Sequence, residues 1–277
     1  MRRSVRGVPS PWSDLDRPPL SAARLRRALV DTGPWRAVDV VERTESTNAD
    51  LAAAARRGED AGLVLLAEEQ SSGRGRLDRR WEAPPRACIL ASALLRPATP
   101  PATWPLISLL TAVAVAEAIR SVGERPAVLK WPNDVLLSGH KVAGILAERV
   151  DDAVVVGIGV NVSVRAPELP VPTATSLAIE GGVADRGSLA AEIFRALGRR
   201  LAAWSEAGGA PYAVLPAYRE ICDTIGRDVT VELPGGSVMQ AHAQAVDDNG
   251  RLVVRRPDGG TDALSVGDVV HVTAAGA

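Results

Sequence analysis

Lys130-Trp131-Pro132-Asn133-Asp134, with Lys141-Val142-Ala143-Gly144-Ile145 shortly after it, organises the middle of this 277-residue chain. Apolar residues flank both lysines, and the Pro132-Asn133 pair predicts a turn between two strands. We therefore expect a β-hairpin with Lys130 and Lys141 near its base. Among the 32 Lys and Arg residues these two are the only lysines. This indicates that an ammonium group is needed at both positions, and not positive charge alone, although two lysines exposed by chance are the alternative.

A glycine-arginine loop, Gly73-Arg74-Gly75-Arg76, precedes this hairpin. Its glycines let the backbone approach an anion, and its guanidinium groups can bond phosphate or carboxylate in a bidentate manner. Arg79, Arg80 and Trp81 follow closely and favour a nucleotide as the ligand. Asp78 stands where a dinucleotide motif would have its third glycine, so that fold is disfavoured. Without its neighbours, the loop is equally well explained as an exposed basic loop.

Two further segments place polar side chains beside predicted elements. Glu45-Ser46-Thr47-Asn48 begins a helix after a strand, where its side chains and the helix dipole can hold a small polar or anionic group. Taken alone, N-capping explains that segment better. Gly157-Ile158-Gly159-Val160-Asn161 puts glycines into a buried strand, which is typical of close approach by a ligand or by backbone. Tight strand packing explains the glycines equally well.

Helical and strand patterns follow one another irregularly, which favours the α+β class over a doubly wound sheet. Helices are predicted around Leu25–Val30 and at 49–57, 104–121 and 188–207. Strands are predicted at 38–41, 62–67, 88–95, 127–131, 135–137, 142–148 and 154–162. Short strands at 228–233, 238–246, 251–255 and 263–264 alternate with Gly-containing turns and predict a small β-barrel, which should depend on docking against the main domain.

Three parts of the chain are expected from these patterns: a Pro- and Arg-rich disordered segment at 1–19, a main domain at 20–224 and the barrel at 225–273. No apolar run follows the first arginines, and the longest apolar stretch, 104–118, is too short to span a bilayer. We therefore expect no signal peptide, no membrane association and a cytoplasmic location.

The composition excludes several functional classes. A net charge of −1 gives no indication of nucleic-acid binding. Cys88 and Cys222 are far apart and are interpreted as reduced thiols. The three histidines lack the spacing of metal ligands, so no metal site is predicted: His140, His242 and His271. The G-x-S-x-G motif is absent, which leaves a serine hydrolase unsupported.

The four polar segments, in this order, resemble the catalytic domain of the biotin–protein ligases over residues 37–165. The small C-terminal unit also matches the plan of that family. The resemblance implies a class II synthetase-like domain, with a mixed sheet flanked by helices, followed by an SH3-like barrel. It implies that biotin and ATP, with Mg²⁺, give biotinoyl-5′-AMP and pyrophosphate. Biotin would then pass to a lysine of a biotin carboxyl carrier protein domain.

The resemblance also implies roles for individual residues. The residues that would bind biotin are Ser46, Thr47, Asn48, Gln70, Arg74, Gly75, Arg76 and Lys141. The residues that would assist the nucleotide are Arg79, Trp81, Lys130, Asn133 and Asn161. Lys141 and Arg76 are the expected catalytic pair, because cations must neutralise a carboxylate and an α-phosphate that repel each other.

Two rival interpretations remain open at this point. A lipoate–protein ligase would share the fold and the adenylation chemistry, although the Lys130–Asp134 segment and the glycine-arginine loop favour biotin. A biotin-responsive DNA-binding regulator is disfavoured by the short segment before Val38, so a monofunctional ligase is expected, as a monomer or a ligand-dependent homodimer. Leu77-Asp78 departs from the Arg-Gly pair often found after this loop in the family, and this bears on how the loop closes.

Overall fold

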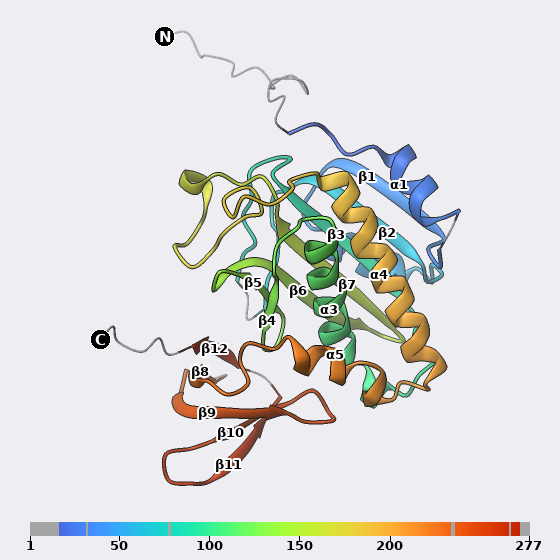
Figure 1. The fold of residues 1–277 in the computed structure, drawn as a ribbon. Coiled ribbons are helices and arrows are strands. Elements are labelled where there is room, and N and C mark those ends of the chain that lie inside the picture. Colours follow the sequence, from blue (N-terminus) through green and yellow to red (C-terminus); the bar gives the residue numbers. More distant parts are fainter. Residues whose placement is uncertain (1–16, 32, 77–78, 234–235, 266, 272–277) are drawn as a thin grey trace, which may run out of the picture.

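The computed structural model describes residues 17–31, 33–76, 79–233, 236–265 and 267–271 (Figure 1). The main unit contains α1 (Ala22–Leu29), β1 (Ala37–Thr44), α2 (Thr47–Arg56), β2 (Leu63–Gln70), β3 (Cys88–Leu95), α3 (Leu106–Ser121), β4 (Val128–Lys130), β5 (Asp134–Leu137), β6 (His140–Val150), β7 (Ala153–Asn161), α4 (Arg186–Glu206) and α5 (Leu215–Glu220). The C-terminal unit contains β8 (Asp228–Glu232), β9 (Val238–Val246), β10 (Leu252–Arg255), β11 (Thr261–Leu264) and β12 (Asp268–His271). The short elements α5 and β12 were not predicted.

The main unit is built on a seven-stranded sheet with the order β1-β2-β3-β7-β6-β5-β4. Strands β1 and β2 are parallel and the other neighbours are antiparallel, so the predicted mixed sheet of the α+β class is confirmed. The single hairpin expected around the two lysines is wrong in detail. Ser138 and Gly139 both have positive φ, 50° and 81°, and form a tight second turn between β5 and β6. Lys141 therefore lies on β6, one strand beyond the hairpin that carries Lys130.

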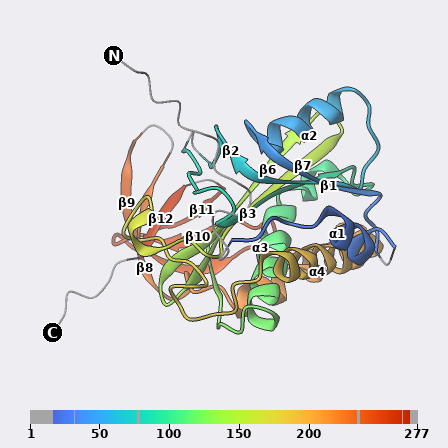
Figure 2. The same cartoon turned by 90° about the horizontal axis from the view of Figure 1, so that it is seen from above.

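The two faces of this sheet carry different layers, because successive side chains of a strand point to opposite faces. On β3, Ile89 and Ala91 pack into the main core with α1, α3 and α4, whereas Leu90 and Ser92 point to the other face. Figure 2 shows α2 on that other side of the sheet. Helix α3 is apolar almost all round because it is enclosed between the sheet and α4.

The C-terminal unit is an antiparallel sheet with the order β11-β10-β9-β8-β12. Its buried side chains, among them Val229 and Val231, belong to the same apolar cluster as the main core. The Nε1 atom of buried Trp131 donates to the carbonyl oxygen of Gly250 at 3.0 Å, which ties the turn after β4 to this sheet. The predicted docking is therefore confirmed. Among the described residues no pairing of β11 with β12 closes the sheet, so the SH3-like barrel stays a prediction.

The start of the described chain lies along the main unit. Disorder was predicted for residues 1–19, of which residues 1–16 lie outside the described part of the chain. At 17–19 the prediction is wrong, because the buried Arg17 guanidinium pairs with Glu168 and donates to the carbonyl oxygen of Ser163 at 2.8 Å. Arg186 likewise donates to the carbonyl oxygen of Pro18 at 2.6 Å. In the part of the chain that the structure describes, no helix is long and apolar enough to cross a membrane.

Candidate active site

A group of polar residues, hereafter the polar cluster (Thr47, Asn48, Gln70 and Ser92), runs from the ends of β1 and β2 to the middle of β3. Because β1 and β2 are parallel and Thr44 pairs with Gln70, the start of α2 meets the end of β2. The backbone N–H of Thr47 donates to Gln70 Oε1 at 2.8 Å, and Thr47 Oγ1 lies 3.0 Å from the same oxygen. Ser46 caps α2, as predicted, by accepting from the N–H of Ala49 at 3.4 Å.

Ser92 and Glu148, which the sequence analysis missed, extend the polar cluster across the sheet. The hydroxyl of Ser92 lies 2.7 Å from Thr47 Oγ1 and donates to Asn48 Oδ1 at 2.6 Å. Asn48 Nδ2 in turn donates to Glu148 Oε2 at 2.6 Å. Thr47, Asn48 and Ser92 are all buried. Every polar group in this row thus has a protein partner.

Three glycines on β6 and β7 form a bare strip of sheet beside the cluster, hereafter the glycine strip (Gly144, Gly157 and Gly159). A Cβ atom at Gly157 would lie 2.3 Å from Asn48 Oδ1, and one at Gly159 would lie 2.6 Å from the Trp81 ring. The glycines are therefore required for the close approach of these two side chains. The structure thus shows neither of the two explanations offered by the sequence: the glycines make room for the side chains of Asn48 and Trp81.

The two lysines converge on one carboxylate. Lys141 Nζ lies 2.6 Å from Asp134 Oδ1, and Lys130 Nζ lies 3.9 Å from Asp134 Oδ2. Lys141 also lies 5.7 Å from the centroid of the Trp81 ring, within reach of a cation–π interaction. The ammonium of Lys141 thus lies beside the glycine strip, where a Cβ at Gly144 would be 3.1 Å from Nζ.

The glycine-arginine loop reaches over the sheet from the end of β2. Arg74 NH1 lies 3.6 Å from Glu148 Oε1, and Arg76 NH1 donates to Asn133 Oδ1 at 3.1 Å. Asn133 Nδ2 donates to the carbonyl oxygen of Ile145 at 2.7 Å, so the turn after β4 is anchored on β6. The Gly75 N–H donates to the carbonyl oxygen of exposed Arg79 at 2.6 Å. Leu77 and Asp78, which depart from the loop pattern of the resembled family, lie outside the described residues.

Asn161, at the end of β7, is held on both sides of its amide. Its Nδ2 atom donates to the carbonyl oxygen of Thr175 at 2.9 Å, and the thiol of Cys88 donates to its Oδ1 atom at 3.4 Å. Burial raises the pKa of Cys88 to about 12, so the thiol keeps its proton and its role as donor. The observed role of Asn161 is to fasten the 173–175 segment against β6 and β7.

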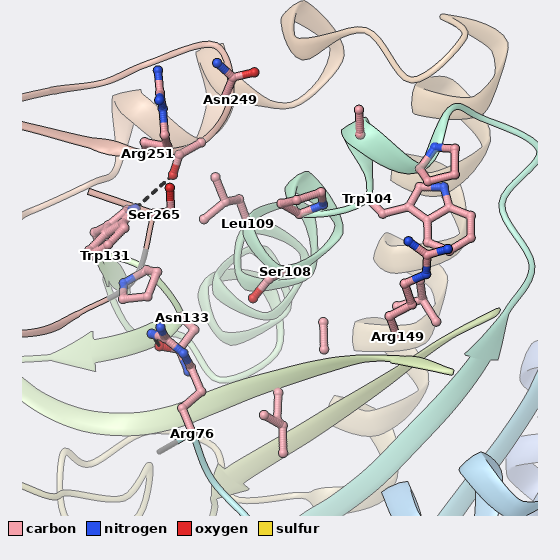
Figure 3. Close-up of a pocket in the computed structure, with 18 residues that line it drawn as sticks. Arg76, Trp104, Ser108, Leu109, Trp131, Asn133, Arg149, Asn249, Arg251 and Ser265 are labelled. Carbon is pink, nitrogen blue, oxygen red and sulfur yellow. Dashed lines mark hydrogen bonds between the residues drawn. The ribbon is translucent and has the colours of Figure 1, made fainter. Parts of the chain in front are cut away.

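A cavity of about 560 Å³ opens between the N-terminus of α3, the ends of β6 and β7, and the C-terminal sheet. Figure 3 shows Arg76 and Asn133 close together at one end of this cavity, and Trp104 with Arg149 at the other. Of the predicted site residues, Arg76 and Asn133 line it. The polar cluster and the glycine strip lie on the other face of the sheet, so the predicted site spans two regions that meet at the glycine-arginine loop.

Chemically, the assembled site pairs hydrogen-bonding groups with cations across a bare strip of sheet. The polar cluster can hold a small ligand with several N–H and C=O groups, while Lys141, Arg74 and Arg76 can neutralise anions. Among the described residues, no group of three or more His, Cys, Asp or Glu side chains is placed to hold a metal ion.

Comparison with known proteins places this chain and its fold in a known class. Residues 40–164 match the Biotin/lipoate A/B protein ligase family, and residues 224–272 match the Biotin protein ligase C terminal domain. The first match lies within residues 37–165, the part of the chain for which the family resemblance was stated.

Individual relatives narrow the assignment. The chain is 44% identical to a biotin–[acetyl-CoA-carboxylase] ligase of Mycobacterium tuberculosis, over 92% of this chain and 97% of the relative. It is 32% identical to a ligase of the same name from Paracoccus denitrificans, over 79% of this chain and 95% of the relative. A solved biotin protein ligase from Aquifex aeolicus, in complex with biotin and ATP, has the same fold: its TM-score is 0.73, with 24% identity over 87% of this chain and all of that one. The chain therefore belongs to the biotin protein ligase family.

Proposed function

We propose that this chain activates biotin with ATP and transfers it to a lysine of a biotin carboxyl carrier protein domain. One observation carries this proposal: the polar cluster, the glycine strip and Lys141 lie side by side on one face of the sheet. The 44% identity to a named biotin–[acetyl-CoA-carboxylase] ligase over nearly the whole chain supports biotin as the ligand rather than lipoate.

The first step joins two anions, the biotin carboxylate and the α-phosphate of ATP. A carboxylate oxygen attacks phosphorus, the bond to the bridging oxygen breaks, and pyrophosphate leaves. Lys141 and Arg76 stabilise the charge that accumulates in this transition state. Asp134, at 2.6 Å, orients the Lys141 ammonium without occupying all three of its donors.

The nucleotide would bind in the cavity next to the glycine-arginine loop. Arg76 and Asn133 stand at the junction between the cavity and the glycine-arginine loop, and a space of about 560 Å³ is in the range of small-molecule sites. Mg²⁺ belongs to this proposal as part of the nucleotide substrate, because this ion keeps most of its contacts with phosphate and water.

In the second step, the neutral amine of the acceptor lysine attacks the carbonyl carbon of the adenylate. An amide bond forms, AMP leaves as a phosphate anion, and the amine loses a proton to solvent or AMP. The mixed anhydride must be kept from water until the acceptor arrives, and a glycine-arginine loop that covers it would do this. An ATP-dependent reaction on a carboxylase subunit is consistent with a cytoplasmic enzyme.

Titration calorimetry with biotin and then ATP, followed by assay of pyrophosphate release, tests the proposal. We expect biotin to bind and to trigger pyrophosphate release in the presence of MgATP, and lipoate at equal concentration not to compete. Pyrophosphate release that depends on lipoate and is indifferent to biotin would show that the substrate has been misassigned.

A further inference from the structure

The direction of the Lys141 side chain depends on an irregularity in β6. The pairing of β6 with β5 shifts by one residue at Val142, which forms a β-bulge. Ala143 and Ile145 belong to the main core, and strict alternation would turn position 141 to the same face of the sheet. Instead, Lys141 Nζ lies beside Gly144, on the face that carries the glycine strip. The bulge therefore determines which face of the sheet receives this ammonium group.

A segment outside the named strands holds the backbone of β6 at this bulge. Strand β7 pairs with β6 only from Ala143 onward. At Lys141 the segment 173–175 takes the place of β7. The Lys141 N–H donates to the carbonyl oxygen of Thr173 at 2.8 Å, and the Thr175 N–H donates to the carbonyl oxygen of Lys141 at 2.9 Å. Both backbone groups of Lys141 are thus bonded to this segment.

The carboxylate of half-buried Glu180 joins this segment to the turn that precedes Lys141. Its Oε1 atom accepts from the hydroxyl of buried Thr175 at 2.7 Å, and its Oε2 atom accepts from the hydroxyl of Ser138 at 2.7 Å. Ser138 has a φ of 50°, which non-glycine residues adopt rarely, so its bond to Glu180 stabilises a turn of unfavourable geometry. One carboxylate thus ties the turn before the bulge to the segment beside it.

Glu180 is ionised at neutral pH. Burial favours its neutral form, but the hydrogen bonds from Ser138 and Thr175, with the charges of His140 and Arg125, hold the pKa of Glu180 below its usual range. A carboxylate only accepts, so both hydroxyl protons point to it. Arg125 Nε also donates to the carbonyl oxygen of Glu180 at 2.5 Å, which fixes the backbone from which the carboxylate projects.

We propose that Glu180 is a positioning residue that holds the bulge at Val142, through Ser138 and Thr175, and so directs Lys141 to the reacting groups. This inference rests on the proposed function, which places Lys141 at the biotin carboxylate and the α-phosphate. Asp134 orients the end of the lysine side chain, whereas Glu180 acts on the backbone that carries it. Without the carboxylate, the turn and the 173–175 segment separate, and the ammonium loses its fixed direction.

The test compares Glu180→Ala and Glu180→Gln with a matched control, Glu117→Ala. Glu117 is also half-buried and accepts two hydrogen bonds, both from Arg200, but it joins α3 to α4. Biotin-dependent pyrophosphate release at saturating biotin and MgATP should fall about 10- to 100-fold in Glu180→Ala, because a small displacement of a reacting group is costly. Glu180→Gln should keep most of the rate, since its amide accepts from one hydroxyl and donates to the other. Glu117→Ala should keep the full rate.

A double-mutant cycle with Lys141→Ala separates positioning from general support of the fold. If Glu180 acts through Lys141, Glu180→Ala should lower the rate by less than about twofold once position 141 is already alanine. A residue that only supports the fold would lower the rate by the same factor in both backgrounds.

Because the chain has two lysines, the direction of Lys141 can also be observed without catalysis. With isotope-labelled lysine, NMR spectra contain the signals of Lys130 and Lys141 alone, and substitution of each by arginine assigns them. Lys141 Nζ lies 5.7 Å from the centroid of the Trp81 ring, so the indole shifts the side-chain resonances of Lys141. Glu180→Ala should move these resonances toward their values in an unfolded chain. Glu180→Gln and Glu117→Ala should leave them near those of wild type.

A normal rate in a folded Glu180→Ala protein, unchanged Lys141 resonances, or an equal loss of rate in both backgrounds would each overturn the inference. Circular dichroism reports folding. If Glu180→Ala does not fold, the same measurements on Thr175→Val, which removes one of the two bonds, decide. Failure of wild type to release pyrophosphate with biotin would instead contradict the proposed function, and the NMR comparison would still test how Glu180 acts on Lys141.

Discussion

Lys141 and Asp134 form an ion pair of 2.6 Å at the point where β5 and β6 meet, and Asp134 is only 14% exposed. Lys130 approaches the same carboxylate at 3.9 Å. One partly buried carboxylate thus positions the two lysines of the chain. Its negative charge also reduces the repulsion between the two ammonium groups.

Lys141→Ala should lower the rate of biotin-dependent pyrophosphate release on the order of 10²- to 10³-fold, because it removes a cation from the forming acyl-phosphate bond. The substitution leaves Asp134 beside Lys130, so the fold should be retained. Assay of pyrophosphate release, with circular dichroism as the control, checks this. A near-normal yield of biotinoyl-AMP would remove Lys141 from the mechanism.

Arg76→Gly should release the adenylate into solvent, because it deletes the bond between the glycine-arginine loop and Asn133 at 3.1 Å. Mass spectrometry of a bystander protein mixed with the enzyme, biotin and ATP should show added biotin on surface lysines. Arg36→Gly, at an exposed pair with Glu59 far from the loop, is the control and should label no bystander. Equal labelling by both variants would contradict this role of Arg76.

Gly157→Ala should lower the free energy of unfolding by about 1–3 kcal/mol and weaken biotin binding, since its Cβ would lie 2.3 Å from Asn48 Oδ1. The control is Gly187→Ala in the first turn of α4, where the nearest atom to the added Cβ is Asp185 Oδ1 at 3.4 Å. That variant should be as stable as wild type or more so. Urea unfolding of both variants measures the difference, and equal stabilities would mean that the glycine strip tolerates side chains.

Trp131→Phe should loosen the C-terminal sheet. The indole N–H of Trp131 is bonded to the Gly250 carbonyl oxygen, and its loss leaves that acceptor unpaired beside a smaller side chain. We expect about 2 kcal/mol of destabilisation. The rate of amide hydrogen exchange should rise mainly in β9 and β10. A rise spread evenly over the chain would argue against this docking contact.

The stability of the C-terminal sheet should also depend on pH through His271. Burial is the largest cause that lowers the pKa of His271 below its usual 6.5; Lys130 and Arg227 act the same way, while Asp223 opposes them. The unfolded chain therefore binds a proton at His271 more readily than the folded chain does. The free energy of unfolding thus decreases as the pH falls below about 6.5. Urea unfolding at about pH 7.5 and about pH 5.5 should show this loss, and His271→Gln should reduce it. Glu168, Glu180 and Asp247 have lowered pKa values, so their protonation changes the stability only at a more acidic pH.

Much of this architecture was predictable because local signals agreed with the final packing. Apolar runs such as Cys88–Leu95 became central strands, buried along their whole length. Ser46 caps α2, as N-capping of this segment predicts, and the glycines at 157 and 159 do mark a close approach, although by side chains and not by ligand or backbone as expected. The residues proposed for the site were brought near one another by the parallel pairing of β1 with β2 and by the order β3-β7-β6.

The remaining features depend on register between strands that are distant in sequence. Ser92 stands among apolar residues of β3, and Glu148 stands beside Arg149 near the end of β6, so nothing local distinguishes them from residues at a solvated face. Their role follows from the positions of β3, β7 and β6 in the sheet, which place both on the face that carries Asn48. The turn at Ser138-Gly139, which the strands predicted at 135–137 and 142–148 already required, places Lys141 on β6, whereas a single hairpin was expected around the two lysines.

The most direct measurement is the intact mass of a biotin carboxyl carrier domain after incubation with this chain, MgATP and either biotin or lipoate. We expect one biotinoyl group to be added on one lysine, with biotin only, and product to form on the order of 10²- to 10³-fold more slowly when Lys141→Ala replaces wild type. A carrier domain that stays unmodified with biotin, or that gains a lipoyl group instead, would contradict the assignment of this chain as the enzyme that biotinylates a carrier.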